Sequence, residues 1–523
     1  MDFLVHHMLR TSAERFPDKE ALVHGDSRLS FSGVEKFVQR VAFGLRNGGV
    51  QRNDRVGIFL EPSVDQVVSI FAVSQAGGVF VPMHHGLFPQ QVMHIINDCE
   101  VKVLVTDAKR LSKLSEQLSE MPSLELIVVV NDSDCAIPQK MVSFKGLSSS
   151  EDLSPWNDVC IQNDLAAILY TSGSTGKPKG VMLSHANIMA GASIVSEYLE
   201  ITNVDRILAV LPFSFDAGLN QLTTAVQQGS TLVLMQFLFA RQIVEMLERE
   251  SITGLAGVPS LWSLLSQPSS KLKTTDLLDL RYITNTGGAM QQTILKKLRE
   301  ALPSTDVYLM YGLTEAFRST YLPPCELDNH SGSMGKAIPN TEVFVVNEQN
   351  ELCGPGEIGE LVHHGPTVSM GYWGHPELTN SVLRPHPFPA SGTLEPCKVC
   401  YSGDLVKTDD DGYLYFVGRR DNQIKSSGFR ISPTEVEEYL CKSANLQEAA
   451  VIGIPDSILG HRIKAFVVPS EGMMVQSEGL LAKCSTYMPR HMIPKTIEVV
   501  EALPKTSSGK IDYSSLRKQE EGV

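Results

Sequence analysis

A run of glycine, serine, threonine and lysine follows a short apolar segment about a third of the way along the chain. It directly follows Ala166–Tyr170 and consists of Thr171, Ser172, Gly173, Ser174, Thr175, Gly176, Lys177, Pro178, Lys179 and Gly180. Glycines let the backbone approach a ligand closely, hydroxyl and backbone amide groups donate hydrogen bonds to phosphate oxygens, and the two lysines neutralise charge. The run therefore predicts a loop that binds a polyphosphate.

This loop differs from the P-loop of common nucleotide triphosphatases. That pattern requires glycine where this chain has Thr171, and serine or threonine where it has Pro178. A P-loop NTPase is therefore disfavoured, and a flexible glycine–serine hairpin without function is the other reading of the same residues.

Five further motifs follow in order. They are Gly287-Gly288-Ala289, Tyr311-Gly312-Leu313-Thr314-Glu315, Tyr401-Ser402-Gly403-Asp404, Gly418-Arg419-Arg420-Asp421 and Pro504-Lys505-Thr506-Ser507-Ser508-Gly509-Lys510. With the loop, these motifs resemble the adenylate-forming superfamily of acyl-CoA synthetases, luciferases and nonribosomal peptide synthetase adenylation domains. The resemblance covers nearly the whole chain and implies an enzyme that uses ATP and Mg²⁺ to join a carboxylic acid to AMP.

The resemblance also implies roles for the nucleotide-binding residues. Tyr311 stacks on the adenine, because contact between two aromatic faces can bind the ring without a charged group. Asp404 accepts hydrogen bonds from both ribose hydroxyls, as one ionised carboxylate can, and Arg419 lies beside the same ribose and phosphate. Thr314 contacts phosphate and Glu315 is the Mg²⁺ ligand, consistent with the oxygen ligands that Mg²⁺ prefers. The remaining ATP-binding residues are the loop residues Thr171, Ser172, Gly173, Ser174, Thr175, Gly176, Lys177 and Lys179, together with Gly287, Gly288, Ala289 and Gly312.

Lys510 is the predicted catalytic cation. Adenylation brings a carboxylate against an anionic α-phosphate, and two unit charges 4 Å apart repel by about 4 kcal/mol at an effective dielectric of 20. In the resembled family a C-terminal domain carries this lysine into the site and then rotates away to admit a thiol. The resemblance assigns the hinge to Asp421 and the lining of a pantetheine tunnel to Lys425 and Gly428.

The segment Leu211–Asn220 bears on the acid that is activated. Many acyl-CoA synthetases carry a histidine here, whereas Phe215-Asp216 is closer to amino-acid adenylation domains, in which the aspartate meets the substrate's amino group. Asp216 also precedes an apolar helical pattern, so a helix N-cap is an equally open reading. Arg318 either binds a second anion of the substrate or pairs with Asp216. The expected pocket lining is Asp216, Asn220, Ala256, Thr284, Thr286, Met310, Arg318 and Ser319, a mixed polar set that suits a small or medium polar acid.

The thiol acceptor is expected in trans, because no carrier domain is recognised in the chain. Because Asp216 resembles the aspartate of amino-acid adenylation domains, a free-standing carrier protein with phosphopantetheine is the favoured acceptor. The alternative is that coenzyme A is the acceptor and that the substrate is a carboxylic acid without an amino group. The stretches Tyr311–Pro323 and Tyr401–Glu438 also resemble exosortase-associated AMP-forming acyl-CoA ligases. A luciferase-like oxygenase and an inactive binding module are the other classes, and the second is disfavoured by Lys510, Glu315 and the full loop.

These residues require several elements to position them. Segments rich in Val, Ile and Leu alternate with amphipathic helical patterns, as in Arg55–Phe59, Val64–Gln75 and Gly78–Val81, which predicts α/β layers with largely parallel sheets. Shorter strands separated by glycine, proline and aspartate turns follow. We expect a large N-terminal domain over 1–420, layered α/β with a small barrel-like β subdomain at about 340–420, and a small mobile α+β C-terminal domain over 421–523.

The composition limits the possible partners and the cellular compartment of the protein. The net charge of −14 repels nucleic acid and anionic membranes, and no apolar run reaches the roughly 20 residues that a membrane span needs. With no leader pattern near Met1, a cytoplasmic enzyme is expected. Nine scattered cysteines indicate reduced thiols. Cys397 and Cys400 alone have metal-like spacing and are expected to be loop cysteines, with a zinc or redox site as the alternative.

Overall fold

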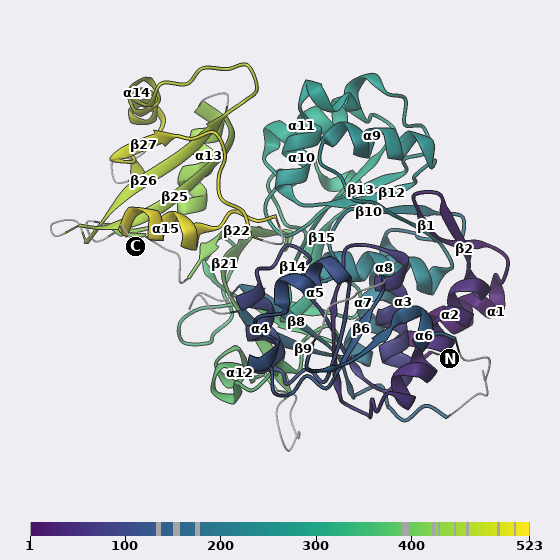
Figure 1. The fold of residues 1–523 in the computed structure, drawn as a ribbon. Helices are drawn as coiled ribbons and strands as arrows, with labels where there is room; N and C mark the ends of the chain where they lie inside the picture. The colour runs from purple at the N-terminus through teal and green to yellow at the C-terminus, as the bar shows by residue number, and fades with distance from the viewer. Residues whose placement is uncertain are drawn as a thin grey trace.

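The computed structural model describes residues 2–131, 137–149, 157–172, 178–389, 397–420, 424–426, 429–443, 446–456, 460–488, 492–506 and 509–521. The predicted α/β class is confirmed, with two large sheets in the first part of the chain and a small α+β unit at its end (Figure 1). Several expected elements have the predicted bounds, among them Arg55–Phe59, Thr231–Leu234 and the helix Pro433–Ser443.

A nine-stranded sheet has the order β16-β15-β14-β13-β12-β10-β11-β1-β2. The pairs from β14 to β1 along this order are parallel, whereas β15, β16 and β2 join antiparallel. Its strands are β1 (Glu20–His24), β2 (Ser27–Ser30), β10 (Arg206–Ala209), β11 (Thr231–Leu234), β12 (Gly254–Gly257), β13 (Tyr282–Asn285), β14 (Asp306–Leu313), β15 (Ala316–Leu322) and β16 (Lys336–Ala337).

Both faces of this sheet are covered by helices. Ile207 packs in one core with α7 (His185–Tyr198) and α8 (Asp216–Gln228), and the next residue, Leu208, packs in another with the helices of the opposite face. Successive strand side chains point to opposite faces, so a buried parallel strand is apolar throughout. The opposite face is covered by α9 (Ala240–Arg249), α10 (Pro259–Leu265) and α11 (Gln292–Ala301).

An eight-stranded sheet has the order β19-β9-β8-β4-β3-β5-β6-β7. Its inner helices share one core with α7 and α8, so the two sheets enclose a common helical layer. Its strands are β3 (Arg55–Phe59), β4 (Val79–Pro82), β5 (Val103–Thr106), β6 (Leu126–Val129), β7 (Lys140–Ser143), β8 (Leu165–Ser172), β9 (Pro178–Ser184) and β19 (Gly371–Tyr372). The associated helices are α1 (Val5–Arg15), α2 (Phe31–Asn47), α3 (Val64–Ala76), α4 (Pro89–Asp98), α5 (Ala108–Leu114) and α6 (Phe144–Leu147).

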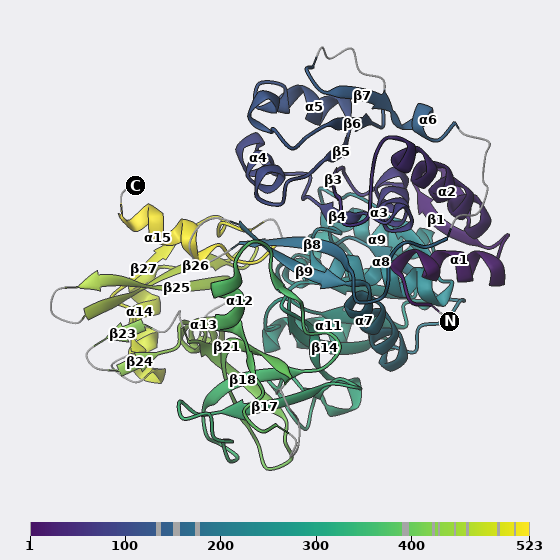
Figure 2. The ribbon, with the colours of Figure 1, turned by 90° about the horizontal axis from the view of Figure 1, so that it is seen from below.

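A smaller antiparallel sheet follows in sequence. Figure 2 places its strands β17, β18 and β21 at the lower edge of the view, away from β5, β6 and β7. Its elements are β17 (Glu342–Val346), β18 (Gly359–His364), α12 (Pro376–Val382), β20 (Leu383–Pro385), β21 (Lys398–Thr408) and β22 (Leu414–Arg419). Short 3₁₀ helices span Leu118–Glu120, Pro268–Ser270, Leu272–Thr274 and Pro324–Glu326.

The last part of the chain forms a lobe of its own in Figure 1, coloured green to yellow. In it β25 and β26 pair antiparallel and β26 and β27 pair parallel, with α13 and α14 packed on the core. Its elements are β23 (Ile424–Ser426), β24 (Phe429–Ile431), α13 (Pro433–Ser443), β25 (Leu446–Asp456), β26 (Gly460–Pro469), α14 (Ser477–Tyr487), β27 (Thr496–Val499) and α15 (Tyr513–Glu521). Among the described residues, no helix combines the length and apolar character needed to cross a membrane.

The cysteine pair needs one correction. Cys400 is not a loop cysteine, because it lies in β21 with no exposed surface, and burial raises the pKa of its thiol well above the usual range. Cys397 is exposed, and its Sγ lies 3.4 Å from His364 Nε2. The candidate metal-binding groups found among the described residues include neither cysteine.

Candidate active site

Three residues that are predicted to bind the ribose and the adenine form one hydrogen-bonded cluster. Tyr311 donates its hydroxyl to Asp404 Oδ2 at 2.5 Å, and Arg419 donates Nη1 to Asp404 Oδ1 at 2.9 Å. Arg419 also donates to the backbone oxygen of Ser402 at 3.1 Å. The cluster joins the end of β14 to β21 and β22, which pair with each other through Asp404 and Arg419.

Asp404 is a buried carboxylate with two fixed donors. Burial raises the pKa of its carboxyl, while the charge of Arg419, the hydrogen bond from Tyr311 and the charge of Lys510 act in the opposite direction. Two strong donors keep the ionised form satisfied inside the protein. The carboxyl group of Asp404 therefore already has a hydrogen-bond donor on each of its two oxygens in this structure.

A histidine lies beneath Tyr311 that motif reasoning did not identify. The His363 ring stacks on Tyr311 with 6.0 Å between centroids, is 1% exposed, and neither ring nitrogen has a hydrogen-bond partner among the described residues. Burial lowers the pKa of His363 to about 3, so the imidazole is neutral. No sequence signal marked this histidine, because five consecutive residues of β18, Gly359–His363, are buried and show no alternation.

The glycine motif after β13 forms a tight loop. Gly287 has φ of +79°, a left-handed conformation that glycine adopts without cost. Asn285 donates Nδ2 to the backbone oxygen of Gly288 at 2.8 Å, and Ala289 is exposed at the surface. A Cβ placed on Gly287 would lie 3.4 Å from Phe215 Cζ and 3.2 Å from Lys510 Cε.

Lys510 therefore reaches the site in this structure. Its Nζ lies 5.7 Å from the centre of the Phe215 ring, although the lysine belongs to the C-terminal lobe. The loop that carries it docks on the larger part of the chain, because Ser260 donates its hydroxyl to the backbone oxygen of Gly509 at 2.9 Å. A second contact between the lobes joins Gln291 Nε2 to Cys441 Sγ at 3.3 Å.

The predicted Mg²⁺ ligand Glu315 accepts a hydrogen bond from Tyr372, with 2.5 Å between the hydroxyl and Oε1. Tyr372 lies in β19, which pairs with β9, the second strand of the hairpin that carries the phosphate loop. The stem of that hairpin pairs Thr171 with Lys179. Thr314 is buried beside Glu315. Tertiary structure thus brings the loop's stem toward Glu315, and Tyr372 is a contact that motif reasoning missed.

The expected acid pocket includes residues of four neighbouring strands of the nine-stranded sheet. Ala256 on β12 is opposite Thr284 on β13, and Met310 lies on the neighbouring β14. Ser319 on β15 is fully buried and donates to the backbone oxygen of Ala316 at 3.1 Å. These side chains are brought to one region because adjacent strands of a sheet place their side chains side by side.

Asp216 requires a correction. It is not the helix N-cap, since Phe215 has the extended N-cap conformation and Asp216 is the first residue of α8. Asp216 is 5% exposed and forms no ion pair with a described residue. A carboxylate in the first turn of a helix is favoured by the helix dipole. The expected alternative of an Asp216–Arg318 ion pair is also not observed, because Arg318 donates Nη1 to Thr286 Oγ1 at 2.8 Å instead.

Several predicted residues lie outside the described residues. These are Gly173, Ser174, Thr175, Gly176, Lys177, Asp421, Gly428 and the side chains of Ser172 and Lys425.

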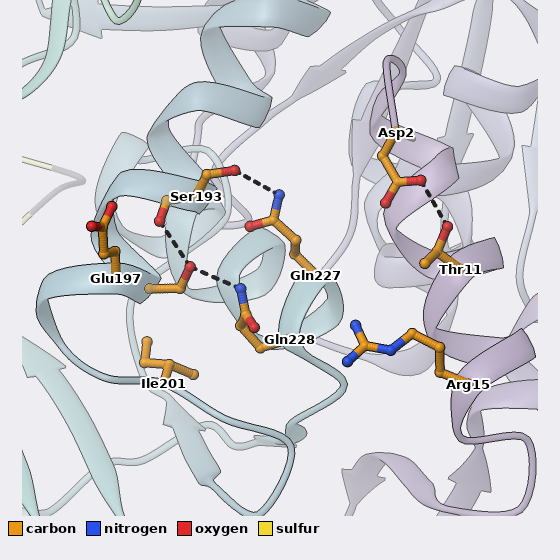
Figure 3. A pocket seen from close by; sticks show the side chains of 9 residues that line it. Asp2, Thr11, Arg15, Ser193, Glu197, Ile201, Gln227 and Gln228 are labelled. Atoms are coloured by element: carbon orange, nitrogen blue, oxygen red, sulfur yellow. Dashed lines mark hydrogen bonds between the residues drawn. The ribbon is translucent and has the colours of Figure 1, made fainter. Parts of the chain in front are cut away.

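A surface hollow of about 420 Å³ lies elsewhere (Figure 3). It is formed by α1, α7 and α8 and the segments next to them, and its walls are mostly polar, with Arg15, Glu197 and Gln227 among them. Ser193 and Gln227 bridge it with a hydrogen bond of 2.9 Å. It contains none of the predicted site residues.

Known protein families match both parts of the chain. The family of AMP-binding enzymes matches residues 9–373, and the AMP-binding enzyme C-terminal domain matches residues 435–510. The chain belongs to the AMP-binding enzyme family. This AMP-binding enzyme is therefore a member of the adenylate-forming superfamily, as the motifs predicted, and its enzyme class is AMP-forming ligase.

Relatives of this AMP-binding enzyme fall into two groups. A feruloyl-CoA synthase from Amycolatopsis sp is 30% identical over 510 residues, which are 97% of each chain. Tyrocidine synthase 3 from Brevibacillus parabrevis is 29% identical over the whole of this chain, which spans 8% of that protein. The first group is matched from end to end, and the second only in a small segment of a much longer chain.

Solved structures share the fold of this AMP-binding enzyme. An anthranilate CoA ligase in complex with anthranoyl-AMP has a TM-score of 0.88 and 25% identity, covering 99% of this chain and 98% of that one. The o-succinylbenzoate coenzyme A synthetase from Bacillus subtilis, in complex with ATP and magnesium ion, has a TM-score of 0.80 and 25% identity, with 98% of each chain covered.

Proposed function

We propose that this enzyme activates a small amino acid with ATP and Mg²⁺ to an aminoacyl-AMP and passes the acyl group to a phosphopantetheine thiol. The observation that carries the proposal is the position of Lys510. A cation from the C-terminal lobe lies against Gly287 and Phe215, and its charge acts on Asp404. The ammonium of Lys510 thus lies close to residues that we expect to hold the adenine and the ribose, which supports the proposal.

The first half-reaction joins the substrate carboxylate to the α-phosphorus of ATP. One carboxylate oxygen forms a bond to phosphorus, the bond to the bridging oxygen of the β-phosphate breaks, and pyrophosphate leaves. Lys510 offsets the repulsion of about 4 kcal/mol between carboxylate and α-phosphate estimated at 4 Å. Glu315 would hold Mg²⁺, which supplies neutralising charge to the phosphates when bound. Tyr311 and Asp404 orient the nucleoside.

The second half-reaction transfers the acyl group. The thiol sulfur bonds to the acyl carbon, the bond from that carbon to the phosphate oxygen breaks, AMP leaves and the thiol proton is released. The docked Lys510 loop occupies the site in the first step, so the lobe must rotate for the second. We assign the hinge to Asp421 and the passage of the pantetheine arm to Lys425 and Gly428, with domains of 1–420 and 421–523.

Asp216 supports the choice of an amino acid. It is a buried carboxylate next to Phe215, which contacts Lys510, and no described cation pairs with it. A buried unpaired charge is costly, and a substrate ammonium removes that cost. A carrier protein is the favoured acceptor on this ground, because the Phe215-Asp216 segment resembles the adenylation domains of nonribosomal peptide synthetases.

Coenzyme A is the second candidate acceptor, with a non-amino acid as substrate. The observation that favours it is the match to feruloyl-CoA synthase over 97% of both chains. In this case Asp216 has another role and the des-amino acid is preferred.

The decisive measurement is acid-dependent exchange of labelled pyrophosphate into ATP across amino, hydroxy, aryl and fatty acids. We expect the best substrate to be an amino acid, and Asp216→Asn to reduce its exchange by about two to four orders of magnitude, from about 3 to 5 kcal/mol for a broken buried ion pair. Thioester formation is then compared with coenzyme A and a phosphopantetheinylated carrier protein. Preference for the des-amino analogue, or an Asp216→Asn effect within a few-fold, overturns the amino-acid assignment. No exchange with any acid overturns adenylation itself.

A further inference from the structure

Arg318 is a buried cation with few partners. Its side chain belongs to a residue that is 3% exposed, Nη1 donates to Thr286 Oγ1 at 2.8 Å, and Nε has no hydrogen-bond partner among the described residues. No carboxylate of a described residue lies within ion-pair distance of it. Arginine remains charged in proteins, and a buried charge is normally paired with an opposite charge. An anionic partner for Arg318 is therefore missing from the part of the chain that the structure describes.

A second donor without a partner lies nearby. Asn220 is 2% exposed, and its Nδ2 has no hydrogen-bond partner among the described residues. A Cβ placed on Gly191 would lie 3.8 Å from this nitrogen and 2.4 Å from the Phe317 ring, and the Arg318 guanidinium carbon is 6.0 Å from the centre of the same ring. Both donors thus lie around Phe317.

The backbone ties Arg318 to the nucleotide motif. A Cβ on Gly312 would lie 2.8 Å from the backbone nitrogen of Arg318, so only glycine fits at position 312 without a shift of one strand. Arg318 itself has φ of +61°, which is rare for a residue with a long side chain. Strained backbone of this kind persists where the surrounding structure enforces it, and it clusters at active sites and ligand-binding sites. The residue is held beside the strand that carries Tyr311.

Asp216 and Asn220 share one face of α8. They are four residues apart, which places their side chains next to each other along the helix. The region therefore contains a carboxylate, an amide donor and a guanidinium in addition to Lys510. A second anionic group on the substrate would face repulsion from Asp216 unless the substrate also carried a cation.

Resting on the proposed function, we infer that the activated acid is an acidic amino acid, with its second carboxylate bound by Arg318 and Asn220. Each charge of this substrate then has one partner. Lys510 meets the reacting carboxylate, Asp216 meets the ammonium and Arg318 meets the second carboxylate, where its planar donors suit two carboxylate oxygens. A neutral side chain would leave the guanidinium buried without a counter-charge.

The test is pyrophosphate exchange with matched sets of acids at two chain lengths, using the full-length protein. L-glutamate is compared with L-glutamine and glutarate, and L-aspartate with L-asparagine and succinate, alongside the broad acid panel. We expect an acidic amino acid to exceed its amide by about 100-fold in kcat/KM, as a buried charge left unpaired implies. The inference is overturned if the amide is within about tenfold of the acid, or if the best acid of the whole panel lacks a second anionic group.

The same sets separate this inference from the proposed function. If glutarate or succinate matches the amino acid, Arg318 keeps its role and the amino-acid assignment fails. If glutamine or asparagine is preferred, the amino-acid assignment stands and the role of Arg318 fails. An enzyme that adenylates no acid contradicts the proposed function as a whole.

Variants give an independent measure. Arg318→Met removes the charge at similar length and is expected to abolish the preference for acid over amide, whereas Arg318→Lys keeps part of it. A purely structural Arg318 would instead reduce exchange with every acid by the same factor and leave the ratio unchanged. Should Arg318→Met fail to fold, as judged by its thermal unfolding, the comparison of acids on the unaltered enzyme decides the question.

Discussion

The hydrogen bond from Ser260 to Gly509 should favour adenylation and not thioester formation. It joins α10 to the loop of the catalytic lysine, with 2.9 Å between the hydroxyl and the backbone oxygen. The same loop is closed internally, since Thr506 and Lys510 exchange hydrogen bonds of 2.8 and 3.2 Å. Ser260 therefore holds a preformed loop, and the bond exists only while the lobe is docked.

The expected size follows from the energy of one such bond. A net contribution of about 0.5–1.5 kcal/mol corresponds to a factor of roughly 2 to 12 in the equilibrium between docked and undocked lobes. When the docked state is the minor one, Ser260→Ala should lower kcat/KM for adenylation by that factor. Thioester formation starts from the other arrangement of the lobe, so its rate should not fall.

Two assays on one preparation test this. Pyrophosphate exchange reports the first half-reaction, and thioester release from synthetic acyl-AMP reports the second. Ser269→Ala is the matched control, because Ser269 also bridges the lobes, to Glu471 at 3.3 Å, but the contact is exposed and distant from the lysine loop; less than a twofold change is expected there. An equal loss in both half-reactions for Ser260→Ala, or an adenylation rate like that of the parent, would refute the reasoning.

Three further outcomes are expected. Lys510→Ala should reduce pyrophosphate exchange by about 1,000-fold, from about 4 kcal/mol of lost charge neutralisation, while transfer from synthetic acyl-AMP stays within a few-fold. Tyr372→Phe should raise the Mg²⁺ concentration for half-maximal exchange by about tenfold, since Tyr372 orients Glu315 at 2.5 Å; an unchanged Mg²⁺ titration contradicts this. Burial raises the pKa of Glu35 from 4.5 to about 7, so the native state holds a proton that the unfolded state releases, and stability falls as pH rises through 7. Between pH 4.5 and 8 the free energy of unfolding should fall by about 3 kcal/mol. The Glu35→Gln variant should not show this fall when its unfolding in urea is measured at the same two pH values.

The sequence by itself determined the enzyme class and the identity of the nucleotide motifs. Residues that are adjacent in sequence are enough for this, because the glycines, hydroxyls and lysines of a phosphate loop are neighbours in the chain. Six such motifs in order identify the family. The alternation of apolar strands with helical patterns also determined the α/β class, since buried parallel strands such as Leu126–Val129 are apolar throughout.

Only the tertiary structure decided which side chains meet across distant segments. Tyr311 and Asp404 lie 93 positions apart, and no local pattern signals their hydrogen bond. Local periodicity likewise could not decide whether Asp216 caps its helix or begins it, because the difference is one residue of backbone conformation. Sequence signals neither the hydrogen bond from Arg318 to Thr286 nor the left-handed backbone at Arg318, a conformation that is uncommon for a non-glycine residue. Long-range contacts and side-chain direction are set by how the sheets pack, and in this packing Arg318 bonds to Thr286 and forms no ion pair with Asp216.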